Sequence, residues 1–129
     1  MLIQRAIQFA LYALPVDRGG GRGEPWNDDE VLATVRDYFD MLRLELDGRP
    51  YVKAEHSREL ARVLNGRTKG AIEQKHMNIS AILQELGYPY INGYKPLKNY
   101  QQLLKQTVEE QIRLLPWLPR ADVRRTGSR

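Results

Sequence analysis

Two amide side chains and three cations, all within one short stretch, have the chemistry to contact a polyanion. Gln74 and Asn78 can each donate and accept a hydrogen bond at once, which suits the major-groove edge of adenine. Their four-residue spacing places them on one face of a helix. Arg67, Lys69 and Lys75 supply positive charge around the beginning of that helix, where phosphates bind favourably. The pattern predicts base contacts by the amides and phosphate contacts by the cations.

Two of these side chains have a second interpretation that the sequence leaves open. The amide of Asn78 also suits a bridge to a neighbouring loop inside the fold, because buried polar groups need hydrogen-bond partners. The alternative for Lys69 is an exposed position at which its ammonium contacts only water. The choice between contact with a polymer and these structural roles therefore needs the fold.

A tyrosine-rich segment further along the chain adds two more cations. Lys95 and Lys98 lie among four of the seven tyrosines. Aromatic rings can stack on unpaired bases, but we favour packing against a small core. The pattern assigns Tyr90 and Tyr100 to that core and leaves Tyr94 unassigned. Lys95 and Lys98 then remain as contacts to a phosphate backbone.

The residues that catalysis or metal binding would require are sparse. His76 falls on an apolar stripe, which predicts a buried structural histidine, and His56 suits a capping or stacking position. Twenty positions separate them, and no acid follows at metal-ligand spacing. Isolated acids such as Glu55 and Glu73 are typical of helix salt bridges. We therefore expect a protein that is not an enzyme and that has no metal site and no cofactor.

The composition indicates one domain of ordinary polarity. The chain has 129 residues, of which 42% are hydrophobic and 28% charged, enough for one small core. It contains no cysteine, which excludes disulfides and cysteine-based zinc sites and fits a reducing compartment, so a cytoplasmic protein is expected. No stretch approaches the ~18 apolar residues of a membrane span, so no membrane partner is expected.

Charge is unevenly distributed along the chain. Residues 26–48 contain seven acids and two bases, whereas residues 49–78 contain seven bases and three acids. Residues 87–105 add three lysines and no acid. One face should therefore be acidic and another basic, which favours an oriented approach to an anionic partner such as DNA.

The periodicity of apolar residues predicts an all-α fold of about four core helices. Asn27, with Glu30 three residues later, forms a capping-box signal. Thr68 and Gly87 mark the beginning and end of a later helix. The expected helices span about 28–47, Lys53 or Ser57 to Leu64, about 69–86, and a final helix from a cap at Asn99 to about Leu115.

The connections complete this predicted architecture. A short turn with Gly66 joins two helices into a helix-turn-helix unit. Asn92 and Gly93 between aromatic residues indicate a short hairpin-like loop, in which the nearby prolines restrict strands. The expected domains are an N-terminal extension with a Gly/Arg-rich linker over 1–25, a helical domain over 26–116 and a disordered basic tail over 117–129.

Much of the chain resembles a known family. The residues that carry the resemblance are Glu55-His56-x-Arg58-x-Leu60, Asn65-Gly66-Arg67, Ile72-Glu73-x-Lys75-His76-x-Asn78-Ile79-Ser80-Ala81-x-Leu83, Glu85-Leu86-Gly87-x-Pro89-Tyr90-Ile91-x-Gly93-Tyr94-Lys95-Pro96 and Asn99-Tyr100-Gln101. Over about 26–112 this pattern resembles the N-terminal head domain of ScoMcrA-like (McrA-type) modification-dependent restriction endonucleases. Trp26, the acidic run Asp28-Asp29-Glu30, and the spacing to Leu60-Ala61 and to Ile72–Lys75 carry a second likeness. Over about 26–83 they resemble Myb/SANT-like helix-turn-helix domains.

The first resemblance implies a helical accessory module from a restriction-modification or phage-defence system. In such proteins the recognition of modified bases and the HNH cleavage belong to other domains. We therefore expect a non-catalytic DNA-binding module. The alternative is a module for protein–protein interaction or assembly, which docks to a restriction nuclease subunit or self-associates without touching DNA.

Overall fold

The structure, a computed structural model, describes residues 24–64 and 66–120. They form four α-helices and, within these ranges, no strand, so the predicted all-α class is confirmed. The bounds are Asp28–Leu46 for α2, Lys53–Val63 for α3, Lys69–Leu86 for α4 and Gln102–Ile112 for α5.

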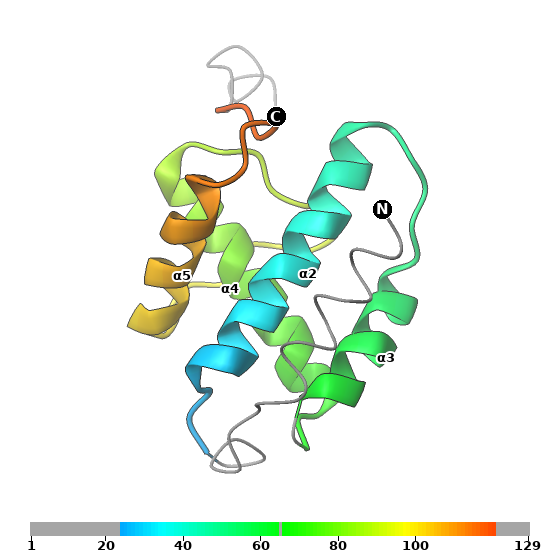
Figure 1. The fold of residues 1–129 in the computed structure, drawn as a ribbon, viewed down its shortest axis with the longest axis vertical. Coiled ribbons are helices and arrows are strands. Elements are labelled where there is room, and N and C mark those ends of the chain that lie inside the picture. The colour runs from blue at the N-terminus through cyan, green and yellow to red at the C-terminus, as the bar shows by residue number, and fades with distance from the viewer. Residues whose placement is uncertain (1–23, 65, 121–129) are drawn as a thin grey trace.

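Helices α2 and α4 form the centre of the fold, and the other two helices flank them (Figure 1). Both α3 and α5 pack against α2 and α4, but α3 and α5 do not contact each other. The core between these helices contains fully buried side chains from all four, including Tyr38, Leu60, Ile79 and Leu104. The surface of α3 therefore lies on the opposite side of the molecule from α5.

The ends of α2 and α4 follow the signals in the sequence. The side chain of Asn27 accepts the N–H of Glu30 at 2.9 Å, and the Glu30 carboxylate accepts the N–H of Asn27 at 3.1 Å. Thr68 caps α4 by accepting the N–H of Ala71 at 3.1 Å. Gly87 ends α4 in the left-handed conformation (φ +83°), which glycine adopts without a steric cost.

The segment between α4 and α5 is irregular. A turn is present at the expected place, where the N–H of Tyr94 bonds to the carbonyl of Ile91 at 3.1 Å, but no strand flanks it. The expected cap at Asn99 is wrong, because α5 begins at Gln102 after Gln101, and Asn99 has a left-handed backbone (φ +68°). The tyrosine in the core is also not one of those predicted. Tyr94 is 3% exposed, whereas Tyr90 and Tyr100, which were expected in the core, are half-buried.

The folded domain continues past its expected end at residue 116. Leu118 is buried in the core, and the ring of Trp117 meets Phe39 edge-on at 6.4 Å. The guanidinium of Arg120 donates to the carbonyl of Leu86 at 3.0 Å. The boundary predicted at residue 117 is therefore too early by at least four residues. The linker before residue 24 and the tail after residue 120 lie outside the described residues.

Candidate nucleic-acid interface

Arg67 lies at the turn before α4, but its side chain points into the fold. Its guanidinium forms a bidentate ion pair with Glu30 of α2, at 2.8 and 2.9 Å. It also donates to the carbonyls of Glu24 and Pro25 and lies over the ring of Trp26 at 4.8 Å. The side chain is only 4% exposed. The expected phosphate contact by Arg67 is contradicted, because its donors are already used to join α2, the preceding segment and the turn.

Lys75 is also used within the fold. Its ammonium donates to Oε1 of Gln101 at 3.2 Å and lies over the ring of Trp26 at 5.1 Å. Burial lowers the pKa of Lys75, and the nearby charge of Arg67 acts in the same direction. The side chain therefore holds the beginning of α5 and the beginning of α2 against α4, and the structure does not support its predicted contact with phosphate.

Asn78 occupies the structural role that the sequence left open. Its amide donates to the carbonyl of Leu97 at 2.5 Å, and the residue is 4% exposed. The N–H of Leu97 bonds in turn to the carbonyl of Met77 at 3.1 Å. The loop before α5 thus covers this face of α4. The prediction that Asn78 faces outward is wrong, so it cannot reach the edge of a base.

Four of the seven predicted contact residues remain at the surface. Lys69, Gln74, Lys95 and Lys98 are all exposed. None of the three lysines forms an ion pair with a described residue. The structure therefore separates the predicted set into a structural group that is used inside the fold and a free group that is available to a partner.

The loop that carries Lys95 and Lys98 is held across α3 and α4. At one end, Lys53 of α3 donates to the carbonyl of Gly93 at 3.4 Å and lies over the ring of Tyr94 at 4.9 Å. At the other end the loop is bonded to Met77 and Asn78 of α4, as described above. Lys95 lies between these two attachments, and Lys98 directly follows the second.

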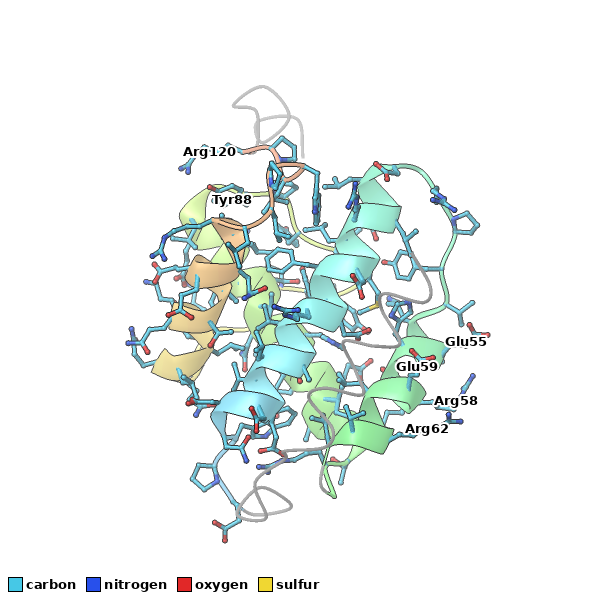
Figure 2. All side chains as sticks on the ribbon, viewed as in Figure 1. Glu55, Arg58, Glu59, Arg62, Tyr88 and Arg120 are labelled. Atoms are coloured by element: carbon cyan, nitrogen blue, oxygen red, sulfur yellow. The ribbon has the colours of Figure 1, made fainter. Side chains whose placement is uncertain are left out.

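The outer side of α3 adds cations that the sequence analysis did not select. Figure 2 shows Arg58 and Arg62 extending from the edge of the molecule together with Glu55 and Glu59. Arg58 lies beside Lys69, because both line a hollow between α3 and the beginning of α4. We give the name α3–α4 face to the exposed cations of α3, of α4 and of the loop bonded to α4, namely Arg58, Lys69, Lys95 and Lys98. Its signals in the sequence were the excess of bases in residues 49–78 and the three lysines without an acid in residues 87–105.

The α3–α4 face also has acids near it. Glu73 is exposed on α4, close enough that its charge helps raise the pKa of Tyr94 to about 12, a shift that burial dominates. Glu55 and Glu59 are exposed on α3. The face is therefore positive overall but mixed, which suits contact with a backbone at several separate points better than a single strong anion site.

A buried polar cluster behind this face was missed by the sequence analysis. Asp37 of α2 accepts from Nδ1 of His56 at 2.7 Å, and its other oxygen lies 3.5 Å from Nε2 of His76. Although burial acts to raise the pKa of Asp37, interactions with both imidazoles lower it below its ordinary value. His76 is completely buried, as its apolar stripe predicted, and its ring lies 4.8 Å from that of Tyr94. One carboxylate thus connects α2, α3 and α4.

A signal for this cluster was present in the sequence. Glu30, Thr34 and Asp37 recur along α2 at helical spacing between apolar residues, and all three are buried. Polar residues in register with a core stripe indicate buried hydrogen-bonded groups. The cluster does not resemble a metal centre, since the described side chains form no group of three that could hold a metal ion.

Comparison with known proteins gave no match to a family, to a curated protein or to a solved structure. The resemblance to the head domain of McrA-type endonucleases therefore stays a prediction. Within residues 24–64 and 66–120, no helix is long and apolar enough to cross a membrane.

Proposed function

We propose that this protein is a non-catalytic DNA-binding module that contacts the phosphate backbone through its α3–α4 face. One observation carries the proposal: Arg58 of α3, Lys69 of α4, and Lys95 and Lys98 of the loop bonded to α4 are all exposed, and none forms an ion pair with a described residue. Cations that are not neutralised within a fold release the counterions of DNA when they bind it, and this release drives non-specific association.

The burial of several predicted contact residues indicates how the protein would bind DNA. Asn78 is sealed, so Gln74 alone of the two predicted amides is placed to meet a base. Tyr94 is buried and presents no ring for stacking, whereas the half-buried Tyr100 is held by the hydrogen bond that its hydroxyl donates to Glu85 at 2.5 Å. Contacts that are mainly to phosphates, with one amide left to reach a base, support binding that tolerates sequence.

The resemblance to the head domain of modification-dependent restriction endonucleases supports the same setting. In that context the module would hold duplex DNA weakly while other domains or subunits supply recognition and cleavage. The competing proposal is an assembly module that docks to a nuclease subunit or to a second copy. The experiment below separates the two.

The test is the affinity for a short random-sequence duplex, measured by fluorescence anisotropy over a range of salt concentrations. Four phosphate contacts predict a slope of log K against log salt of about −4, so affinity should fall on the order of 100-fold between about 50 and 200 mM salt. Lys69→Ala, Lys95→Ala and Lys98→Ala should each reduce the slope by about 1.

Arg113→Ala is the matched control, because Arg113 is exposed at the end of α5, which does not contact α3. It should leave both affinity and slope unchanged. Light scattering on the same sample gives the oligomeric state. A stable dimer that does not bind duplex at low salt would overturn DNA binding and support assembly.

A further inference from the structure

A hollow of about 310 Å³ lies within the α3–α4 face. It opens between one side of α3 and the first residue of α4. The volume is near the lower limit for small-ligand sites, which begin at roughly 300 Å³. The lining residues are Ala54, Ser57, Arg58, Ala61 and Lys69.

The hollow exists because the side chains at its base are small. Ala54, Ser57 and Ala61 recur at helical spacing along α3, so no long side chain fills this part of the seam. Ser57 is 8% exposed and its hydroxyl interacts with Tyr94, which fixes the base of the hollow to the buried cluster. Gly70 directly follows Lys69 of the lining, and its position is open, since an added Cβ would meet nothing within 4 Å.

The groups around the hollow are those that bind phosphate. Arg58 and Lys69 are exposed cations without an ion pair among the described residues. Thr68 satisfies the N–H of Ala71 and leaves the N–H groups of Lys69 and Gly70 without an acceptor in the described chain. Two cations of different reach, with free N–H groups beside them, can hold an oxyanion beside the small side chains of the hollow.

We propose that this hollow seats one phosphodiester of the DNA backbone, with its adjoining sugar against Ala54 and Ala61. The inference rests on the proposed DNA-binding function and assigns it a central contact. Phosphates elsewhere along the backbone then meet Lys95 and Lys98, which lie on the loop bonded to α4. A filled hollow would remove this contact without changing any charge.

That consequence gives a direct test with Ala61→Leu, which fills the hollow from an exposed helical position. Loss of one phosphate contact should weaken duplex binding about fivefold at physiological salt and reduce the salt slope by about 1. Gln106→Leu on α5 is the matched control, because it adds the same side chain at an exposed site outside the face. Urea unfolding of both variants shows that the fold is intact.

The outcomes distinguish this inference from the function on which it rests. If Ala61→Leu binds like the parent while Lys95→Ala and Lys98→Ala still weaken binding, the hollow is not a contact and DNA binding stands. If the parent shows no salt-dependent duplex binding, the proposed function itself fails.

The source of the phosphate is tested by following the amide signal of Gly70 by NMR. Duplex should shift it at far lower concentration than inorganic phosphate or a mononucleotide does. Equal responses to all three would overturn the assignment to a DNA backbone and indicate a site for free anions.

Discussion

Arg67→Ala should destabilise the domain strongly and leave the salt slope of DNA binding unchanged. The substitution removes the bidentate ion pair and strands the Glu30 carboxylate, which belongs to a residue that is 1% exposed. Removing one partner of a buried ion pair typically lowers the unfolding free energy by about 3–5 kcal/mol, and we expect about 4 kcal/mol here. The unfolding free energy of such a domain is about 5–15 kcal/mol, so the loss is a large share of the total.

Urea unfolding followed by circular dichroism measures this loss. With a denaturant slope of about 2 kcal/mol per molar, the midpoint should fall by about 2 M. Arg62→Ala is the control, because Arg62 is exposed on α3 and a surface substitution usually changes stability by less than about 0.5 kcal/mol. Arg67→Lys should give an intermediate loss, since lysine keeps the charge but cannot form the bidentate pair.

A double-mutant cycle identifies the cause of the loss. Glu30→Ala together with Arg67→Ala removes the stranded charge, so the double variant should be less destabilised than the sum of the two single variants. A single-variant cost below about 1 kcal/mol, or strictly additive losses, would refute the reasoning that this pair is a structural tie. A reduced salt slope in the folded Arg67→Ala variant would instead restore the sequence-based prediction of a phosphate contact.

Two further predictions concern buried polar groups. Because the pKa of Asp37 is lower in the folded than in the unfolded chain, its ionised form stabilises the fold above about pH 4, and this stabilisation is lost as pH falls through the folded pKa. Urea unfolding at several pH values should therefore show a flatter acid dependence for Asp37→Asn, and an unchanged acid limb would contradict the assignment. In the same assay, Asn78→Ala should lower the unfolding free energy by about 1–2 kcal/mol, because the carbonyl of Leu97 loses its donor. The exposed Gln74→Ala should leave the unfolding free energy unchanged. Equal effects of the two substitutions would show that Asn78 is not buried beneath the loop.

The helices were predictable because their signals are local. The capping box of Asn27 and Glu30, the cap at Thr68 and the left-handed end at Gly87 depend only on neighbouring residues, and all three are present. The apolar stripe of α4 was also correct at Ile72 and His76, which are fully buried. Periodicity therefore sufficed for the class of fold and for most helix ends.

The site was less predictable because it depends on contacts between distant segments. A helical wheel places Asn78 away from the core, but it cannot indicate that the loop at Leu97 will cover that side. Arg67 forms an ion pair with Glu30, which lies 37 residues earlier, and no local sequence pattern predicts that pairing. The choice between Tyr94 and Tyr100 as the core residue likewise depends on where an irregular loop is held.

The loop between α4 and α5 has a consequence for engineering. Segments without regular structure usually tolerate added residues, but this one is bonded along its length to Tyr38, Glu45, Met77 and Asn78. Lengthening it would shift the register of these bonds and uncover one side of α4. Affinity tags, fluorescent labels and split points are better placed in the connection between α2 and α3, where residues 47–50 are all exposed.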